Sequence, residues 1–262
     1  MDLQLAGKII IVTGGARGIG ESIVKVLAAE GAVPVIISRT EAYNQALVST
    51  LNTAGYQAAQ FTADLTHPEE AERAVEFVLI QFGRIDGLVN NAGENDGVGL
   101  EHGDYEGFMA SLHKNLTHYY LMAHFALPAL KESKGSIVNI TSKTADTGQG
   151  GTSAYAAANG GRNALTREWA VELLKYGIRV NAVVVAECWT PLYERWIQTL
   201  SNPDEKLASI VANIPFENRM TTPEEIANTT VFLLSSRSSH TTGQLIYVDG
   251  GYVHLDRALA NS

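Results

Sequence analysis

The chain has 262 residues, 45% of them hydrophobic and 18% charged, which is typical of one globular domain with enough length to bury a core. Its net charge of −9, without a basic cluster, argues against nucleic acid and anionic membranes as partners. The single cysteine, Cys188, excludes an intrachain disulfide, and the first residues lack the regions of a signal peptide, so we expect a cytoplasmic protein. The sequence contains neither a membrane-spanning apolar run nor a metal-ligand spacing among its histidines, so no membrane or metal is expected.

The first half of the chain alternates between strand and helix patterns. Short apolar runs predict buried strands, because a parallel strand covered on both faces reads as a near-continuous apolar run. The predicted strands are 9–12, 33–38, 57–62 and 85–90. The predicted helices are 19–30, 41–52, 66–82, with Thr66 as the N-cap of a capping box, and 104–127, which Pro128 ends.

The second half continues this alternation with one interruption. The predicted strands are 135–142, 179–185 and 245–248, and the predicted helices are 152–176 and 223–234, the second capped by Thr222-Pro223-Glu224-Glu225. Residues 188–220 contain only short helical patches, 192–200 and 203–212, which are typical of a small lid. The alternation predicts one α/β domain, 1–262, of the Rossmann type: a doubly wound parallel sheet of about seven strands with helices on both faces.

The stretch Thr13-Gly14-Gly15-Ala16-Arg17-Gly18-Ile19-Gly20 joins the first strand to the first helix. A strand that turns sharply into a helix leaves the first N–H groups of the helix unpaired, and the positive end of the helix dipole lies at the same place. Glycines at 14, 18 and 20 allow the tight turn and the close approach of a diphosphate to the backbone. The stretch therefore predicts a dinucleotide site.

Further motifs follow the later strands. Asn90-Asn91-Ala92-Gly93 follows the fourth strand, Asn115 lies in the long helix, Ser142 ends the fifth strand and Tyr155 starts the next helix. With the Gly-rich stretch, this combination resembles the short-chain dehydrogenase/reductase family over essentially the whole chain. The resemblance implies cofactor contacts from Gly14, Arg17, Gly18, Ile19, Gly20, Ser38, Arg39, Asp64, Leu65, Asn91, Ala92, Gly93, Tyr155 and Thr190.

The end of the second strand indicates which dinucleotide binds. Ser38 and Arg39 stand where an acidic residue would bind the ribose 2′-hydroxyl of NAD, and no acid is present. A guanidinium can bind a 2′-phosphate in a bidentate manner, and Arg17 in the Gly-rich stretch is a second candidate cation. We therefore expect NADP as the cofactor, with NAD as the alternative if both arginines are solvated surface residues.

The resemblance also implies the catalytic residues. Tyr155 would exchange a proton with the substrate oxygen, Ser142 would polarise that oxygen, and Asn115 would support a proton relay. In the family, a lysine four residues after the tyrosine favours the tyrosinate and holds the nicotinamide ribose, but here that position is Asn159. An asparagine can hydrogen-bond a ribose hydroxyl, yet it supplies no positive charge. Loss of positioned acid–base catalysis costs about 10²–10⁴-fold in rate.

Two functions stay open on this evidence. The first is an oxidoreductase, impaired by Asn159 unless the missing charge comes from Arg162, two helical turns after Tyr155, or from Lys143. The second is a dinucleotide-binding protein of dehydrogenase fold with little or no turnover. The family resemblance also implies a homo-tetramer with interfaces on helices 104–127 and 152–176.

Polar side chains near the expected nicotinamide position indicate the substrate. The Glu187 carboxylate would accept hydrogen bonds from vicinal hydroxyls, which favours a sugar or polyol over an acyl chain; capping of the following helix is the alternative. The candidate substrate contacts are Asn95, Lys143, Gln149, Glu187 and Trp189. The segments 95–97, 142–144, 148–152 and 249–257 resemble the L-fucose dehydrogenase-like branch of the family, whose members oxidise the C1 hydroxyl of the sugar to a lactone.

Overall fold

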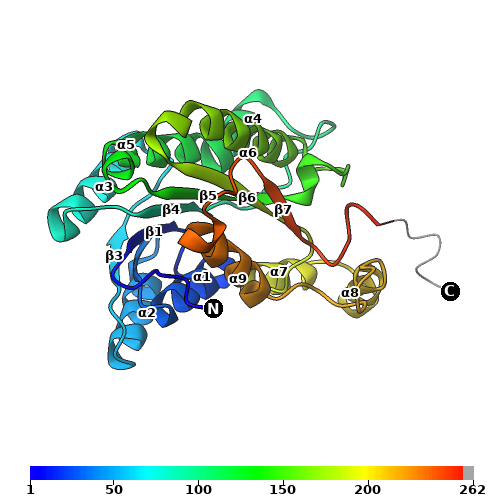
Figure 1. Cartoon of the computed structure of the whole chain (residues 1–262). Helices are drawn as coiled ribbons and strands as arrows, with labels where there is room; N and C mark the ends of the chain where they lie inside the picture. Colours follow the sequence, from blue (N-terminus) through cyan, green and yellow to red (C-terminus); the bar gives the residue numbers. More distant parts are fainter. Residues whose placement is uncertain (256–262) are drawn as a thin grey trace.

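The strands form a single parallel sheet. The computed structural model describes residues 1–255, and its strands lie in the order β3-β2-β1-β4-β5-β6-β7 (Figure 1). Their bounds are β1 Ile9–Thr13, β2 Val33–Ser38, β3 Ala59–Thr62, β4 Gly87–Asn90, β5 Ser136–Ser142, β6 Arg179–Val185 and β7 Leu245–Val248. The predicted doubly wound sheet is confirmed. The end of the predicted domain, 256–262, with Asp256 and Arg257 of the branch motif, lies outside the described residues.

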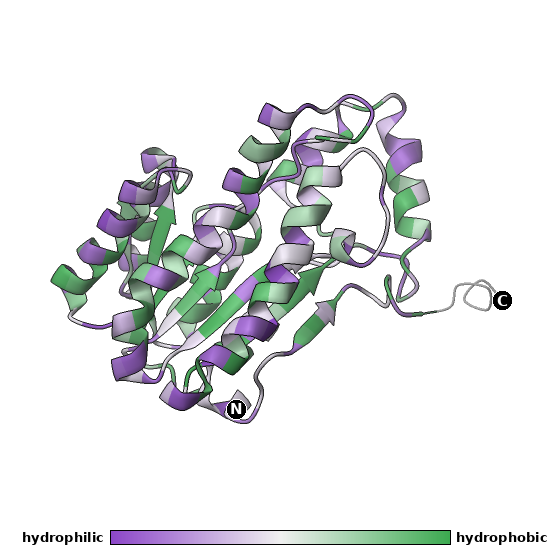
Figure 2. Cartoon of the chain, turned by 90° about the horizontal axis from the view of Figure 1, so that it is seen from above, coloured by the Kyte–Doolittle hydropathy of each residue, from purple (hydrophilic) through white to green (hydrophobic). Residues whose placement is uncertain are grey.

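Helices cover both faces of the sheet (Figure 1). One face carries α1 Gly18–Ala29, α2 Glu41–Thr53 and α9 Pro223–Leu234, and the other carries α3 Pro68–Phe82, α5 His118–Ser133 and α6 Ser153–Glu172, with α4 Tyr105–Leu112 beside α6. Alternate residues of β1 enter opposite cores: Ile9 and Ile11 pack on the second face, Ile10 and Val12 on the first. Strands buried on both sides are therefore mostly hydrophobic, whereas the helices also carry hydrophilic residues (Figure 2).

The predicted helix 104–127 is divided in the structure. α4 and α5 are joined by a π-helical turn, His113–Thr117, which widens the helix around Asn115. The sequence predicts that Pro128 ends the helix. This is wrong: Pro128 lies inside α5, which continues to Ser133. The buried side chains of Ala126 and Leu130 on either side of Pro128 pack against the sheet, and this packing outweighs the hydrogen bond that the proline removes.

The two predicted capping boxes differ in outcome. Thr66 is not the N-cap of α3: the helix begins at Pro68, its N-cap is His67, and the Thr66 hydroxyl donates to Asp64 Oδ1 at 2.7 Å. The Thr66 hydroxyl is thus directed back toward Asp64, one residue before the position from which it could cap α3. At α9 the box is present, because Thr222 and Glu225 each accept from the other's backbone N–H, at 3.3 and 2.8 Å.

Residues 188–220 contain the two short helices of the predicted lid. α7 covers Pro191–Ile197 and α8 covers Pro203–Ala212, and the two contact each other after the end of β6. Only α7 contributes side chains to the cleft described below. Within the described residues, no helix combines the length and the apolar character needed to cross a bilayer.

Candidate active site

A cleft of about 490 Å³ opens beyond the carboxyl ends of β1 and β4. The strand order reverses between these two strands, and doubly wound sheets bind their ligands at such a reversal. The Thr13 hydroxyl oxygen accepts hydrogen bonds from the N–H groups of Asn91 and Ala92, at 2.9 and 3.1 Å. The side-chain amide of Asn91 donates to the Thr13 carbonyl at 3.0 Å. These bonds hold the loop after β4 against the Gly-rich loop.

The Gly-rich loop has the backbone that a diphosphate requires. Gly14 and Gly18 adopt φ values of +62° and +58°, in the left-handed region that favours glycine. A Cβ at Gly20 would lie 2.2 Å from the Gly14 carbonyl oxygen, so no side chain fits there. Arg17, the N-cap of α1, makes no capping hydrogen bond, so the N–H groups of the first turn are available to an anion. These features fit a bound dinucleotide.

Two arginines line the end of the cleft beside β2. The Arg17 guanidinium lies 4.6 Å from the centroid of the Tyr43 ring, and Arg39 is exposed. Neither forms an ion pair within residues 1–255. The Ser38 hydroxyl donates to Asn44 Oδ1 at 2.5 Å, which holds it against α2. This end of the cleft is therefore cationic.

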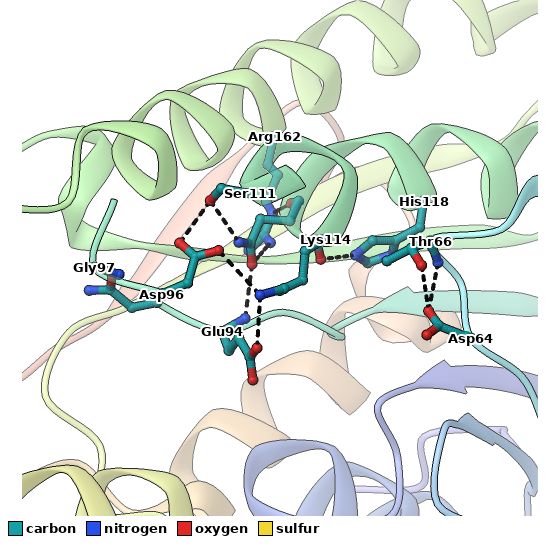
Figure 3. A network of polar contacts seen from close by, with 11 residues as sticks. Asp64, Thr66, Glu94, Asp96, Gly97, Ser111, Lys114, His118 and Arg162 are labelled. Atoms are coloured by element: carbon teal, nitrogen blue, oxygen red, sulfur yellow. Dashed lines mark hydrogen bonds and ion pairs between the residues drawn. The ribbon is translucent and has the colours of Figure 1, made fainter. Parts of the chain in front are cut away.

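Asp64 and Leu65 border the next part of the cleft. The N–H and the hydroxyl of Thr66 donate to Asp64 Oδ1 at 3.0 and 2.7 Å (Figure 3). Partial burial acts to raise the pKa of the Asp64 carboxyl, but these hydrogen bonds and the charge of Arg39 outweigh it, so the pKa lies below its usual value. Asp64 thus offers an ionised acceptor to a ligand in the cleft.

A charged network lies beside this region (Figure 3). Lys114 Nζ pairs with Glu94 at 3.2 Å and with Asp96 at 3.4 Å. His118 Nε2 lies 2.9 Å from the Lys114 carbonyl oxygen, and burial, with the charge of Arg162, lowers the pKa of this imidazole to about 3. The ring is therefore neutral with its proton on Nε2. Its Nδ1 is a buried acceptor without a partner among the described residues, and His118 lines the cleft.

The predicted hydroxyl and phenol border the other end of the cleft. Ser142 ends β5, Tyr155 lies in the first turn of α6, and both line the cleft. Asn115 is fully buried in the π-helical turn, where its Oδ1 accepts a hydrogen bond from the Glu94 N–H at 2.9 Å. Ser142 and Tyr155 therefore border the same cleft as the Gly-rich loop.

Comparisons with known proteins agree with this arrangement. A family model described as enoyl-(acyl carrier protein) reductase matches residues 14–253. L-fucose dehydrogenase from Bos taurus is 34% identical over 252 residues, which cover 96% of this chain and 91% of the relative. The 3-oxoacyl-[acyl-carrier-protein] reductase FabG from Thermotoga maritima is 33% identical over 252 residues, which cover 96% of this chain and all of the relative. The chain belongs to the short-chain dehydrogenase/reductase family.

Solved structures of this family are closely similar. The crystal structure of Cj0485 dehydrogenase has a TM-score of 0.93 and 48% identity, and the match covers 99% of both chains. Aldohexose dehydrogenase from Thermoplasma acidophilum has a TM-score of 0.87 and 28% identity, covering 98% of both chains. As a short-chain dehydrogenase/reductase, the chain is an oxidoreductase with an NAD(P) cofactor.

Asn159 stands where the family resemblance implies a lysine. Asn159 is fully buried in α6. Its Nδ2 donates to the Tyr155 carbonyl at 2.9 Å, and its Oδ1 accepts from Arg162 Nη1 at 3.0 Å. Both polar atoms of the amide therefore have partners within the helix. The hydrogen bond from Asn159 to a ribose hydroxyl stays a prediction.

A buried ion pair follows Ser142. Lys143 Nζ donates to Glu187 Oε1, and the two side chains are only 8% and 14% exposed. The ammonium lies 3.8 Å from the centroid of the Tyr252 ring. Burial and the Glu187 carboxylate raise the pKa of the Tyr193 phenol. Glu187 does not cap the following helix; Thr190 caps α7 by accepting from the Tyr193 N–H at 3.1 Å.

The remaining predicted substrate residues divide into two groups. Asn95 lines the cleft, whereas Lys143 and Glu187 do not, although their neighbours Ser142 and Ala186 do. Gln149 is exposed, and Trp189 packs near the Tyr193 ring, with centroids 6.1 Å apart; neither lines the cleft.

Several cleft residues were missed from the sequence. Lys114 directly precedes the predicted Asn115, and His118 lies one helical turn after Lys114. The helical spacing from Asn115 could have indicated Lys114 and His118 as cleft residues. Tyr43 lies in the first turn of α2, where helical periodicity alone does not reveal a contact with Arg17. Tyr252, which does not line the cleft, follows the last strand, and only the fold brings its ring to Lys143.

Proposed function

We propose that this enzyme oxidises the C1 hydroxyl of an aldose to a lactone, with NADP as the preferred cofactor. The observation that carries the proposal is the buried Lys143–Glu187 pair directly after Ser142. An ammonium and a carboxylate offer donors and acceptors to adjacent hydroxyls of a sugar. Neither side chain lines the cleft, but Ser142 and Ala186, which precede them in the chain, do. A sugar hydroxyl at this end of the cleft would find polar partners in the pair, whereas an apolar acyl chain would find none.

The names of two relatives support a sugar as substrate. L-fucose dehydrogenase covers nearly the whole chain at 34% identity, and aldohexose dehydrogenase has the same fold over 98% of the chain. Relatives with acyl substrates, such as the FabG reductase, have similar overall identity, so identity alone does not choose between the two substrate classes. The charged pair favours the sugar.

The chemistry requires one proton and one hydride to leave the sugar. Ser142 donates a hydrogen bond to the C1 oxygen, and the Tyr155 oxygen takes the proton of the C1 hydroxyl. When bound, the nicotinamide accepts the hydride from C1, and the C1–O bond becomes the carbonyl of the lactone. Asn115, buried behind the cleft, fixes the loop after β4 through the Glu94 N–H. In reverse, Tyr155 returns the proton to the carbonyl oxygen.

The preference for NADP is supported by the cationic end of the cleft. Arg17 and Arg39 line it, and both guanidinium groups lack an ion-pair partner among residues 1–255. A 2′-phosphate carries charge that two guanidinium groups bind well, whereas the 2′-hydroxyl of NAD gains little from them. Ser38 is held by Asn44 and contributes no negative charge.

One observation favours a second function, dinucleotide binding with little turnover. Asn159 occupies the position of the family's active-site lysine and supplies no charge. In this alternative the cleft would bind NADPH tightly while no sugar is oxidised. The same assay distinguishes the two functions.

The assay measures the formation of reduced nicotinamide from NADP or NAD with a panel of aldoses and polyols, and its consumption from NADPH or NADH with 3-oxoacyl thioesters, from pH 7 to 10. We expect oxidation of L-fucose or D-arabinose, loss of at least ~10²-fold in Tyr155→Phe, and no reduction of acyl thioesters. Turnover of an acyl thioester alone would contradict the sugar proposal. Tight NADPH binding without any turnover would establish the binding function instead.

We also expect a homo-tetramer. Several large apolar side chains are exposed on the helices that the family resemblance assigns to interfaces: Tyr105, Tyr120, Val171 and Leu174. Burial between subunits would remove this apolar surface from water. Light scattering after size exclusion should give four times the 28.2 kDa chain mass, and a monomer at micromolar concentration would contradict the expectation.

A further inference from the structure

Arg162 is a buried cation without a buried anion. The residue is 2% exposed, and it takes part in no ion pair within residues 1–255. Arginine is almost never fully buried unless it is paired, because desolvation of the charge is costly. The groups around Arg162 show why a guanidinium without an ion-pair partner is buried at this position.

Neutral oxygens hold the guanidinium in place. Arg162 Nε donates to the Asn115 carbonyl at 2.5 Å, and Nη1 donates to the Ile140 carbonyl at 3.3 Å and to Asn159 Oδ1 at 3.0 Å. Nη2 lies 3.4 Å from Asn115 Oδ1 (Figure 3). The carbonyl groups come from β5 and from the π-helical turn, so three elements fix the group while its charge stays uncompensated.

The guanidinium borders the cleft at its catalytic end. Arg162 lines the cleft together with Tyr155 and Ser142, and a Cβ at Gly93 would lie 2.7 Å from Arg162 Nη2. The guanidinium carbon lies 5.9 Å from the centroid of the Tyr155 ring. The charge is therefore close to the phenol that takes the substrate proton.

The titratable groups that face Arg162 from α5 are both neutral. Its guanidinium carbon lies 4.2 Å from the centroid of the Tyr119 ring, and burial raises the pKa of that phenol. The hydroxyl of Tyr119 donates to the Ile140 carbonyl at 2.8 Å. His118 is neutral for the reasons given above. Across the cleft, Glu94 pairs with Lys114. The phenolate of Tyr155 is thus the anion that the site itself can offer to Arg162.

We propose that Arg162 stabilises the Tyr155 phenolate in place of the family's lysine, and that Asn159 positions Arg162 for this role. The inference rests on the dehydrogenase chemistry of the proposed function but not on its sugar. If the 5.9 Å from the guanidinium carbon to the centre of the Tyr155 ring is used as the separation of the two charges, an effective dielectric constant of about 20 gives a change of about 100-fold in the equilibrium. Arg162 stays protonated throughout, because guanidinium does not lose its proton in proteins.

The contacts of Asn159 explain why the positive charge is on Arg162, about one helical turn after position 159 in α6. Its carbonyl oxygen binds Arg162 Nη1, and its amide nitrogen binds the carbonyl of Tyr155, so one side chain connects the two. A lysine at 159 would place an ammonium beside the buried guanidinium, and like charges in a buried site are unfavourable. Asparagine and arginine therefore fit as a pair at these two positions, whereas lysine and arginine do not.

The test compares Arg162→Gln and Arg162→Lys with the exposed control Arg167→Gln on the same helix. We expect Arg162→Gln to lose about 100-fold in kcat near neutral pH, a loss that shrinks as the pH rises, so that the midpoint of the pH–rate profile moves up by about two pH units. Arg162→Lys should retain part of the rate. Arg167→Gln should leave the profile unchanged. A loss in Arg162→Gln that is equal at every pH would overturn the proposal.

The double variant Asn159→Lys/Arg162→Gln keeps one cation in the site and tests the pairing. We expect it to recover at least ~10-fold over Arg162→Gln, whereas Asn159→Lys alone should lower stability because it adds a second charge. If Arg162→Gln fails to fold, the rate of the double variant is compared with that of Tyr155→Phe instead. A folded double variant with the rate of Tyr155→Phe would overturn the proposal.

A titration without substrate separates this inference from the proposed function. The ultraviolet absorbance of the cofactor-free protein, minus that of Tyr155→Phe, reports the ionisation of Tyr155. Its midpoint should lie about two pH units higher in Arg162→Gln than in the unaltered protein. If the midpoint moves while no sugar is oxidised, the proposed sugar oxidation is contradicted and the role of Arg162 is supported. If a sugar is oxidised and the midpoint does not move, the inference fails and the function stands.

Discussion

The ammonium of Lys143, the residue after Ser142, donates a hydrogen bond to the Glu187 carboxylate, and both side chains are almost completely buried. Lys143 follows β5 and Glu187 follows β6, two strands that pair through Ser142 and Val185. The parallel register of the sheet therefore brings the two charges together. Each charge stabilises the other, because removal of one would leave the second buried without a partner of opposite charge.

Loss of one partner should cost more than loss of both. Lys143→Met alone leaves the carboxylate of Glu187 buried, and we expect the free energy of unfolding to fall by about 3 kcal/mol. The double variant Lys143→Met/Glu187→Leu removes both charges and should recover most of this loss. Denaturant unfolding measures the unaltered protein, Lys143→Met, Glu187→Leu and the double variant. Additive effects of the two substitutions would show that the charges do not depend on each other.

The double variant also reports on substrate binding. Because the sugar hydroxyls lose their proposed partners, the KM for the sugar should rise at least ~10-fold while the affinity for NADPH stays unchanged. Gln149→Ala is the matched control on the substrate side, since Gln149 is exposed and takes no part in the buried ion pair. An unchanged KM in the folded double variant would exclude the ion pair from the sugar site.

Arg17 and Arg39 should together determine the preference for NADP. We expect Arg17→Ala and Arg39→Ala each to weaken NADPH binding at least ~10-fold, because each removes a cation from a phosphate, while NADH binding changes less than about threefold. Fluorescence titration of both reduced cofactors measures this difference. Arg73→Ala, an exposed arginine of α3, is the control. Equal affinities of the unaltered protein for NADPH and NADH would contradict the prediction.

The strands were the most predictable part of the fold. The sequence predicted 33–38, 179–185 and 245–248 with the bounds that the structure gives to β2, β6 and β7. Apolar runs mark such strands because both faces of the sheet are covered. Pro128 was misread since a local rule about helix ends does not include the packing of Ala126 and Leu130 on the sheet.

The site was predictable where a motif lies in one stretch of sequence. The strand–turn–helix context identified the Gly-rich loop before the structure showed its left-handed glycines. Helical spacing placed Arg162 on the same face as Tyr155, but it did not reveal that Asn159 connects the two. That contact depends on the rotamers of three side chains, and the burial of the guanidinium depends on a carbonyl of β5. Neither is encoded in spacing.

Two glycine substitutions should separate the cofactor loop from the catalytic helix. In Gly20→Ala the new Cβ would meet the Gly14 carbonyl oxygen at 2.2 Å, so the loop must move, and we expect NADPH affinity to fall at least ~10-fold. In Gly160→Ala the Cβ meets nothing within 4 Å inside α6, so stability should rise by about 0.5–1 kcal/mol with unchanged cofactor affinity. Tight binding by Gly20→Ala would show that the loop tolerates a side chain.

His118 should make the stability of the protein dependent on pH in a defined window. Burial and the charge of Arg162 lower its pKa to about 3 in the folded chain, against 6.5 for a solvent-exposed histidine. Below pH ~6.5 the unfolded chain binds a proton that the folded chain does not, so the free energy of unfolding falls as the pH falls towards 3. The slope approaches ~1.4 kcal/mol per pH unit within this window.

Urea unfolding between pH 7.5 and 5 measures this slope, since the carboxyl groups Asp64, Asp86 and Glu225, whose pKa values are lowered, lose their protons below that range. His118→Gln keeps a neutral donor for the Lys114 carbonyl but cannot take up a proton. It should therefore be less sensitive to acid than the unaltered protein by about 1 kcal/mol per pH unit. His124→Gln removes an exposed imidazole of the same helix and should retain the full slope. A slope that is equal in His118→Gln and the unaltered protein would show that the buried imidazole is already accessible to protons.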